Sequence, residues 1–328
     1  MLDLLIHERS FARLADELKT RQAAVRPIMM TDDGRFVDAG GNAIDGPPDA
    51  DIGYGTQDAY FSPAVMKYME AILSAKKLQW FQSAAAGIEH PILRAIRDHA
   101  ELYTSAHEQS PAIAEWVLWA GLDWCQGGAA RRKAQSEKIW HRAQFRELSD
   151  TKWVIVGFGS IGRACAQRLR FFGAHITGVR RTPGDDQDAD RMITPSQLLS
   201  ALPEADCVLL CCPLTSETEN MANAEFFSQM KSESLFLNVG RGGLVDEAAL
   251  IEALAQNRPD RAALDVTAVE PLPPESGLWD HPKVTLTAHI SALTDRSARR
   301  SDLVFLENLD HFLVQKPMRN LVAKDQES

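Results

Sequence analysis

The first third of the chain alternates short apolar runs with stretches in which apolar residues have helical spacing. Apolar residues at positions 11, 14, 15 and 18 are three or four apart, the spacing of one helix face. A similar pattern covers residues 63–75, whereas the runs at 2–6, 51–55 and 78–82 predict strands. This repeated alternation of strand and helix predicts a parallel α/β unit.

The alternation resumes in the second half of the chain with the β-branched run at 154–156. Further strands are predicted at residues 175–179, 207–212, 235–239, 262–266 and 284–287. Helical patterns cover residues 195–202, 224–230 and 247–255, and a last one covers 296–314 beyond the final strand. This half therefore predicts a second, doubly wound α/β domain, and the last helix could pack back on the first domain.

Two segments interrupt the alternation. Residues 31–53 are rich in Asp, Gly, Asn and Pro, and the apolar pairs at 36–37 and 43–44 flank a glycine-rich turn, which predicts a small exposed hairpin. Residues 111–129 predict a strongly apolar helix, and the charged segment 131–146 follows it. An apolar helix with a polar arm beyond it suits either a bridge between domains or a subunit interface.

The run at 154–156 leads directly into the pattern G-x-G-x-x-G, which is followed by a helical pattern. Gly157 would make the tight turn, Gly159 would let a pyrophosphate approach the backbone, and Gly162 would let the helix pack on the strand. The first N–H groups of a helix are unpaired and lie at the positive end of its dipole, so the turn at Ser160 and Ile161 would bind phosphate. Together these residues predict a dinucleotide site.

The strand at 175–179 is followed by Arg180, Arg181 and Thr182, where a carboxylate often binds the ribose hydroxyls of NAD. A guanidinium matches phosphate geometry through its fork of donors. These residues therefore predict that NADP(H) is preferred, through its 2′-phosphate, with NAD(H) possible. The alternative is an exposed charge pair, with Asp185 or Asp186 turning in to bind NAD.

Charge and composition exclude several classes of function. The net charge of −10 argues against a nucleic-acid surface, which requires basic patches. The sequence has no apolar run near the ~18 residues of a membrane span and no signal-peptide pattern at its start. Its five cysteines lack paired metal spacing, so we expect reduced thiols in a cytoplasmic protein and no metal site. From the charge and the hydropathy we expect no nucleic-acid or membrane partner.

Three stretches place polar residues at predicted strand ends, where open α/β sheets bind their ligands. They contain Arg241, Glu270 and His289. If the fold brings these three side chains together in one crevice, they could bind a carboxylate and transfer a proton. Each also has a simpler explanation, because His289 could be a hydrogen-bonded strand-end histidine and Arg241 and Glu270 a structural ion pair.

The order of these stretches resembles the D-isomer-specific 2-hydroxyacid dehydrogenases, in particular the glyoxylate and hydroxypyruvate reductases. The resemblance covers most of the chain. It rests on the glycine loop, the stretch from Cys212 to Thr218, residues 238–250, the stretch from Asp265 to Pro271, and His289. The chain departs from the family pattern at Ala288, where a proline commonly precedes the histidine.

The resemblance implies an α/β fold of two doubly wound parallel-sheet domains. A Rossmann NAD(P)-binding domain (112–292) would be inserted in a flavodoxin-like substrate domain made of residues 1–111 and 293–328. The length of 328 residues suits two domains of about 150 residues each. The apolar helix and the arm through Trp140 are similar to the family's dimer contact, so a homodimer is expected.

The resemblance also implies the roles of individual residues. Arg241, Glu270 and His289 would be the catalytic set. Arg241 and His289 would bind the substrate, and N–H groups of the turn Ala85-Ala86-Gly87 would hold its carboxylate together with Arg241. Besides the glycine loop and residues 180–182, the expected cofactor contacts are Cys212, Pro213, Thr218, Val239, Asp265 and His289.

The implied reaction is reduction of a small 2-oxo acid, such as glyoxylate or hydroxypyruvate, to a D-2-hydroxy acid. His289 would protonate the developing alkoxide, Glu270 would orient the imidazole, and Arg241 would position the substrate. Two alternatives remain at this point. One is a dehydrogenase for a bulkier 2-oxo acid, and the other is a dinucleotide-sensing binding protein similar to the corepressor relatives of the family.

Overall fold

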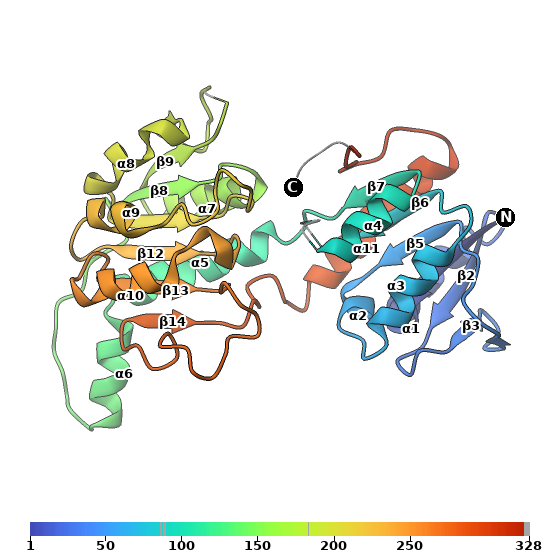
Figure 1. Ribbon diagram of the computed structural model, residues 1–328, viewed down its shortest axis with the longest axis horizontal. Helices are drawn as coiled ribbons and strands as arrows, with labels where there is room; N and C mark the ends of the chain where they lie inside the picture. The colour runs from blue at the N-terminus through green and yellow to red at the C-terminus, as the bar shows by residue number, and fades with distance from the viewer. Residues whose placement is uncertain (86, 88–89, 183, 325–328) are drawn as a thin grey trace. The chain divides into compact units, whose positions relative to one another are not determined.

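Residues 1–85, 87, 90–182 and 184–324 are described by the computed structural model, and the chain divides into two units (Figure 1). The first unit contains Met1–Gln109 together with Thr294–Ser328, and the second contains Ser110–Leu293. The first unit is therefore discontinuous, because the segment that follows the second unit returns to it.

The described part of the first unit contains a seven-stranded sheet. Its strands are β1 (Leu2–His7), β2 (Val25–Met30), β3 (Phe36–Asp38), β4 (Ala43–Ile44), β5 (Ile52–Gly55), β6 (Trp80–Ser83) and β7 (Leu102–Ser105). Its helices are α1 (Glu8–Lys19), α2 (Gln57–Tyr60), α3 (Val65–Ser74), α4 (Pro91–His99) and α11 (Ser297–Leu313).

The strands of this sheet follow the order β4-β3-β2-β1-β5-β6-β7. Strands β2, β1, β5, β6 and β7 pair in parallel, which is the flavodoxin-like order. The sheet is not parallel throughout, because the predicted hairpin forms β3 and β4 and adds them in antiparallel pairing at the β2 edge. The parallel strands are the part that resembles a doubly wound domain.

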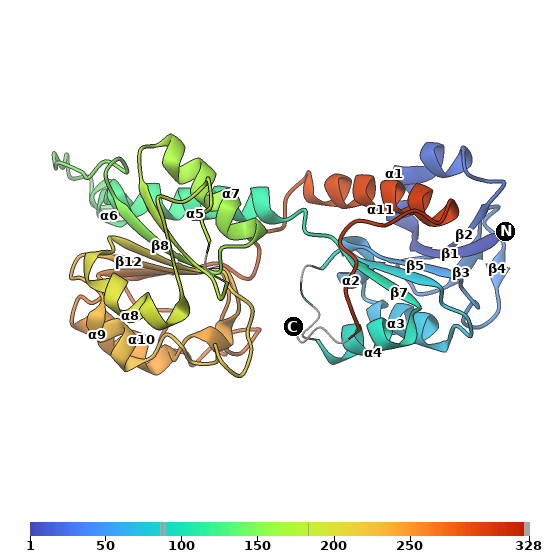
Figure 2. The same ribbon diagram turned by 90° about the horizontal axis from the view of Figure 1, so that it is seen from above.

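Helices cover both faces of the first sheet (Figure 2). Side chains of a strand point alternately to opposite faces. Leu4 of β1 accordingly packs in a cluster with Phe305 of α11, whereas its neighbour Leu5 packs in another cluster with Tyr68 of α3. All four side chains are fully buried, so the two apolar layers fix this unit from both sides.

The described part of the second unit contains another seven-stranded sheet. Its strands are β8 (Lys152–Val156), β9 (His175–Val179), β10 (Arg191–Ile193), β11 (Cys207–Leu210), β12 (Leu235–Asn238), β13 (Arg261–Leu264) and β14 (Val284–Leu286). Its helices are α5 (Ser110–Cys125), α6 (Gly128–Ser136), α7 (Ser160–Phe171), α8 (Leu198–Ala201), α9 (Ala224–Gln229) and α10 (Glu247–Ala255). Single 3₁₀ turns are η1 (Pro195–Gln197), η2 (Leu202–Glu204) and η3 (Gly242–Leu244).

The second sheet has the order β10-β9-β8-β11-β12-β13-β14, and all its strand pairs are parallel. Its first six positions have the Rossmann arrangement, and β14 extends the sheet beyond β13. The strand order reverses between β8 and β11. The loops that leave the carboxyl ends of these strands therefore share one edge of the sheet, where open α/β sheets bind their ligands.

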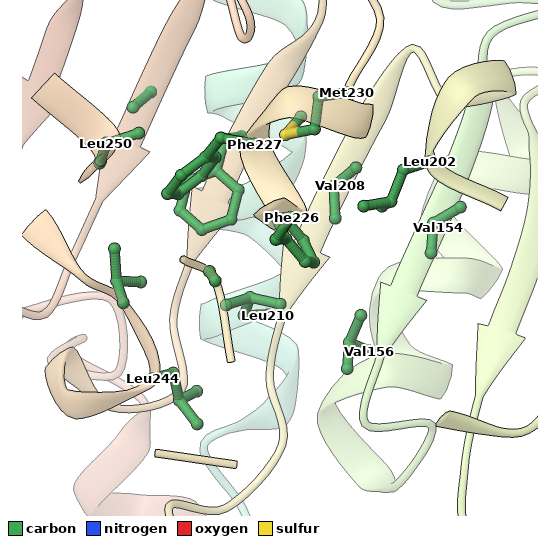
Figure 3. Close-up of a cluster of buried hydrophobic side chains, with 14 of the residues drawn as sticks. Val154, Val156, Leu202, Val208, Leu210, Phe226, Phe227, Met230, Leu244 and Leu250 are labelled. Atoms are coloured by element: carbon green, nitrogen blue, oxygen red, sulfur yellow. The ribbon is translucent and has the colours of Figure 1, made fainter. Parts of the chain in front are cut away.

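The core of the second unit lies on both faces of this sheet (Figure 2). On one face, Val154 and Val156 point toward a cluster that includes Phe226 and Phe227 of α9 (Figure 3). Ile155, between the two valines, packs instead in the cluster formed with α5 and α7. The run at 154–156 is therefore buried on both sides, which explains why it is β-branched throughout.

Helix α5 packs against β8 and continues into an exposed segment. A Cβ added to Gly121 would lie 3.0 Å from the Trp153 ring, so the helix approaches the sheet closely at that position. Beyond α6, residues 137–147 are all exposed, and the Trp140 side chain is 88% exposed. Within the described ranges, no helix is both long and apolar enough to cross a membrane.

Candidate active site

The loop between β8 and α7 has the geometry that a dinucleotide pyrophosphate requires. Gly157 has a φ of +98°, and a Cβ there would lie 2.5 Å from the amide nitrogen of Cys212. A Cβ on Gly162 would lie 2.5 Å from the Gly157 carbonyl oxygen. Gly159, in contrast, faces open space, with no described atom within 4 Å of such a Cβ. Two glycines are thus required by close packing, and the third leaves room for a ligand.

Helix α7 begins at Ser160, immediately after this open position. Its N-cap, Gly159, provides no side-chain hydrogen bond to the first turn. The N–H groups around Ser160 and Ile161 are therefore available to an anion at the positive end of the helix dipole. These features fit the phosphates of NAD(P).

The loop after β11 lies against the glycine loop and is closed by its own hydrogen bonds. The Thr218 hydroxyl donates to the Pro213 carbonyl over 2.8 Å, and the Thr215 N–H donates to the Thr218 hydroxyl oxygen over 2.8 Å. Burial raises the pKa of the Cys212 thiol to about 11, so this thiol is protonated at neutral pH. Val239, which follows β12, is buried at the same edge of the sheet.

Arg180 and Arg181 differ in what surrounds them. The Arg180 guanidinium is bonded within its own loop, where it donates to the Thr182 carbonyl over 2.9 Å and to the Gly184 carbonyl over 2.7 Å. Arg181 is exposed, and among the described residues it has no hydrogen-bond or ion-pair partner. Arg180 therefore shapes the loop, and Arg181 is the guanidinium that is open to a ligand.

Asp186 was one of the two alternative ligands for an NAD ribose, with Asp185, and its carboxylate lies against two cations. Arg163 of α7 donates to Asp186 Oδ2 over 3.0 Å from Nε, and Arg180 Nη1 lies 3.4 Å from the same oxygen. Desolvation raises the pKa of Asp186, but the hydrogen bonds from Arg163 and the Asp188 N–H, together with the charges of Arg163 and Arg180, outweigh it, so its pKa is lowered. The sequence analysis missed Arg163, whose position directly after Gly162 was the available signal.

Glu270 and His289 are brought into direct contact. His289 Nδ1 lies 2.8 Å from Glu270 Oε2, and both side chains are partly exposed, by 48% and 39%. The other carboxylate oxygen, Oε1, accepts the Thr267 N–H over 3.1 Å. Glu270 thus binds the Thr267 N–H through Oε1 and the imidazole through Oε2. An imidazole oriented in this way suits a proton-transferring histidine.

Asp265 is buried beneath this histidine. Its carboxylate accepts the Thr287 hydroxyl over 2.6 Å, the Ile290 N–H over 2.9 Å, and both the N–H and the hydroxyl of Ser291. Its carbonyl accepts the His289 N–H over 2.7 Å. The sequence analysis gave no role to Thr287 or Ser291, although each stands two positions from the histidine.

Arg241 lies in the loop that leaves β12. One of its guanidinium N–H groups donates to the Gly240 carbonyl over 2.7 Å, and its own carbonyl accepts the Asn238 side-chain amide over 2.8 Å. A Cβ on Gly242 would lie 1.9 Å from the Thr267 carbonyl group. The Arg241 loop therefore packs backbone to backbone against the segment that leads to Glu270.

A cavity of about 520 Å³ adjoins the histidine and the glutamate. The residues that line it include Glu270, Pro271, Leu272, Trp279, Leu286 and His289. Its lining combines the ionisable side chains of Asp265, Glu270 and His289 with several apolar ones. Among the described residues, no group of three or more His, Cys, Asp or Glu side chains could hold a metal ion.

The predicted substrate turn follows β6 and belongs to the first unit. The Ala85 N–H donates to the Ser83 hydroxyl oxygen over 3.0 Å, and the Ala85 carbonyl accepts the Ser105 hydroxyl over 2.5 Å. The N–H of Ala85 is therefore already engaged within the turn. Ala86 lies outside the described residues, and Gly87 lies in irregular chain.

Residues 118–291 match the family model for the D-isomer specific 2-hydroxyacid dehydrogenase, NAD binding domain. A glyoxylate reductase/hydroxypyruvate reductase from Mus musculus is 34% identical over 165 residues, which are 49% of this chain and 50% of that protein. The chain thus spans about half the length of curated relatives such as this one.

Solved structures match almost the whole chain. A D-isomer specific 2-hydroxyacid dehydrogenase family protein from Aeromonas salmonicida superposes with a TM-score of 0.80 at 26% identity and covers 99% of both chains. A D-isomer specific 2-hydroxyacid dehydrogenase from Xanthobacter autotrophicus, solved with NADPH and MES, has a TM-score of 0.77 at 25% identity and covers 98% of both chains. The two-unit architecture is thus shared with these proteins.

Proposed function

This chain belongs to the D-isomer-specific 2-hydroxyacid dehydrogenase family, and we propose that it reduces a small 2-oxo acid to a D-2-hydroxy acid, with NADPH as the preferred cofactor. The observation that carries this proposal is the His289–Glu270 contact of 2.8 Å, made at the carboxyl edge of the sheet that also carries the glycine loop. Glyoxylate and hydroxypyruvate are the first candidate substrates, because a relative that carries both names aligns with half of this chain.

His289 is the proposed acid of the reduction. Its Nδ1 is held by Glu270, so its Nε2 would donate a proton to the oxygen that develops negative charge on the substrate. In the reverse direction the same nitrogen would accept that proton. When bound, the nicotinamide supplies the hydride to C2 of the 2-oxo acid. Glu270 would orient the ring throughout.

Arg241 is the proposed ligand of the substrate carboxylate. A guanidinium can hold two oxygens at once, which would position the carbonyl for reaction and stabilise its developing charge. The turn that contains Ala85, Ala86 and Gly87 would add backbone N–H groups. Because the Ala85 N–H is already donated to Ser83, Gly87 is the described residue that remains for this role.

The preference for NADPH rests on the loop after β9. Arg181 is exposed and would bind the 2′-phosphate, while Arg180 and Thr182 would hold the loop that presents it. Asp186 would bind the ribose hydroxyls of NAD only if it left its pairing with Arg163. The related protein from Xanthobacter autotrophicus was solved with NADPH, which supports the same choice here.

The cavity beside His289 supports a second candidate substrate class. Leu272, Trp279 and Leu286 line it, so the side chain of a bulkier, apolar 2-oxo acid would find favourable contacts there. This candidate keeps the same reaction and the same proposed catalytic residues.

One assay tests both candidates and the cofactor preference. The purified full chain is mixed with glyoxylate, hydroxypyruvate, pyruvate or phenylpyruvate, each with NADPH and with NADH, and oxidation of the cofactor is followed by absorbance. Fast NADPH oxidation with the small acids is expected, and faster turnover of phenylpyruvate would favour the second candidate. Tight NADPH binding without turnover of any 2-oxo acid would contradict the proposed reductase activity and favour a dinucleotide-sensing protein.

We also propose that the protein is a cytoplasmic homodimer formed through α5 and the exposed arm. A groove of about 400 Å³ on α5 is lined by Leu118, Trp119 and Leu122 among others. The Trp119 side chain is 44% exposed although the helix is strongly apolar. A second copy of the chain would remove these side chains from water. All five cysteines are free thiols, as a reducing compartment requires.

A further inference from the structure

His289 has a backbone conformation that requires support. Its φ is +54°, in the left-handed region that residues with a Cβ rarely adopt because the side chain crowds the carbonyl oxygen. Such a conformation persists only where the surrounding contacts hold it in place. The contacts that do so here converge on a single residue, Asp265 of the neighbouring loop.

Asp265 holds the chain on both sides of the histidine. Its carboxylate accepts a hydroxyl from Thr287, two positions before His289, and both an N–H and a hydroxyl from Ser291, two positions after it. Its carbonyl accepts the N–H of His289 itself over 2.7 Å. Asp265 is 1% exposed and Ser291 is 6% exposed, so water does not compete for these hydrogen bonds.

These donors occupy the carboxylate of Asp265. A carboxylate offers about four lone-pair positions, and the Thr287 hydroxyl, the Ile290 N–H, and the N–H and hydroxyl of Ser291 are directed to them. The carboxylate of Asp265 is thus engaged by the chain on both sides of His289, which supports a role in holding the histidine.

Two independent constraints then set the direction of the imidazole. The Asp265 contacts fix the backbone from which the side chain leaves, and the Glu270 carboxylate fixes the rotation of the ring through Nδ1 at 2.8 Å. With both constraints in place, the imidazole has a single orientation and its Nε2 atom faces one way. Without the first constraint, the Glu270 contact alone would let the ring shift with its backbone.

We propose that Thr287, Asp265 and Ser291 are positioning residues that form a clamp on the His289 turn and aim its Nε2 at the substrate. The proposal rests on the proposed function, because it assigns these residues to the histidine of that same reaction. The hydroxyls of Thr287 and Ser291 are the specific elements of this clamp, since the remaining donors are backbone N–H groups that any residue supplies.

The test removes the two hydroxyls and leaves the carboxylate in place. The double variant Thr287→Val/Ser291→Ala is compared with Thr287→Ser, which keeps the hydroxyl. Three quantities are measured on the full chain: kcat and KM with glyoxylate or hydroxypyruvate, the Kd for NADPH by fluorescence, and the nitrogen NMR signals of isotopically labelled histidine. The signal of His289 among the 9 histidines is identified by its loss in the variant His289→Gln.

The clamp predicts a fall in kcat of about 10- to 100-fold for the double variant, the range expected when a reacting group is displaced by about an ångström. The Kd for NADPH is expected to stay unchanged, the His289 nitrogen signals are expected to move, and Thr287→Ser is expected to behave as the wild type. Unchanged kcat with unchanged His289 signals would overturn the proposal. A weakened Kd with unchanged kcat would overturn it in favour of a cofactor contact.

The NMR measurement separates this proposal from the proposed function. If the wild type turns over no 2-oxo acid, the proposed reaction fails, but a shift of the His289 signals in the double variant still supports the clamp. Thermal unfolding checks that the double variant is folded. If it is not, the single variant Thr287→Val is compared with Thr287→Ser by the same criteria.

Discussion

His289 and Glu270 are 19 positions apart in the chain, yet Nδ1 of the imidazole lies 2.8 Å from Oε2 of the carboxylate. The contact exists because β13 and β14 are parallel neighbours, so the segments that leave their carboxyl ends meet at the same edge of the sheet. Neither side chain is buried, at 48% and 39% exposure. The pair is therefore ordered by a direct hydrogen bond and remains accessible to a substrate.

Replacement of this histidine tests its role as the acid. His289→Gln is expected to lower kcat by roughly 10²- to 10⁴-fold, the usual contribution of a positioned acid or base, and to weaken NADPH binding far less. Glu270→Gln, which keeps an acceptor but loses the charge, is expected to give a smaller loss. The control is Glu275→Gln, an exposed glutamate in the same loop. Equal losses in turnover and cofactor affinity would contradict the role given to His289.

The two arginines after β9 are expected to have different effects on cofactor choice. Arg181→Ala removes the exposed guanidinium, and a charge-assisted hydrogen bond of about 1.5–3 kcal/mol corresponds to a loss of roughly 10- to 100-fold in NADPH affinity. NADH affinity is expected to be unchanged. Arg180→Ala loosens the loop by removing its bonds to Thr182 and Gly184, so it should affect both cofactors to a similar degree. A selective effect of Arg180→Ala alone would reverse the assignment.

The periodicity of apolar residues predicted most of the parallel strands, because strands buried on both faces are continuous apolar runs. It did not predict β2, in which Arg26 and Pro27 interrupt the apolar run. Nor did it predict β7, or α4, although Leu93 and Ile96 of α4 are buried and have helical spacing. These elements form because neighbouring strands and helices cover them, which a short window of sequence does not show.

The family and its fold were confirmed by the comparisons, and the site was predicted only in part. The sequence marked Glu270 and His289, and their contact follows from strand ends that share one edge. It did not indicate that Arg163 pairs with Asp186, or that Ser291 pairs with Asp265. Those pairings join residues more than twenty positions apart and depend on the packing of loops, for which apolar periodicity carries no information.

Helix α11 is anchored within the first unit by an ion pair between the buried Asp302 and the partly exposed Arg13. Asp302 is fully buried, accepts from Arg13 Nε over 2.8 Å and accepts the Tyr54 hydroxyl over 3.0 Å. Asp302→Ala leaves the fully buried Tyr54 hydroxyl without its acceptor, whereas Arg13 keeps its ion pair with Asp58. The substitution is therefore expected to lower the free energy of unfolding by about 1–3 kcal/mol. Asp310→Ala is the matched control, since Asp310 lies on the same helix, pairs with Arg21 and is 53% exposed.

The control variant is expected to lose no more than about 1 kcal/mol, because an exposed pair is screened by water. Urea unfolding of both variants provides the comparison. Equal losses in the two would show that burial does not decide the strength of these pairs, and would remove the basis for treating Asp302 as the anchor of α11.

His7 gives the first unit a sensitivity to acid. Its side chain is fully buried at the end of β1, where Nδ1 accepts the Arg9 N–H over 3.3 Å and Nε2 lies 3.3 Å from Asp32. Burial lowers its pKa below the usual 6.5, and this effect outweighs the nearby carboxylates. As the pH falls through 6.5, the unfolded chain binds a proton at His7 that the folded chain does not, so the stability of the folded chain falls.

Replacement of His7 should therefore reduce the loss of stability in acid. His7→Asn keeps a side chain that can accept the N–H of Arg9, and its free energy of unfolding is expected to change less than that of the wild type between about pH 7.5 and about pH 5.5. The control is His175→Asn, at a histidine whose side chain is 60% exposed. An identical pH dependence of the wild type and His7→Asn would contradict the assignment.

The proposed dimer contact on α5 can be separated from a general effect of exposed aromatic residues. Trp119 lines the groove on α5 and is 44% exposed, whereas Phe171 at the end of α7 is 89% exposed and lies elsewhere on the same unit. Burying an unpaired charge in a contact between two copies is unfavourable because the charge loses its hydration. Trp119→Glu is therefore expected to give a monomer in light scattering. Phe171→Glu should leave the dimer intact, and a monomeric wild type would refute the interface.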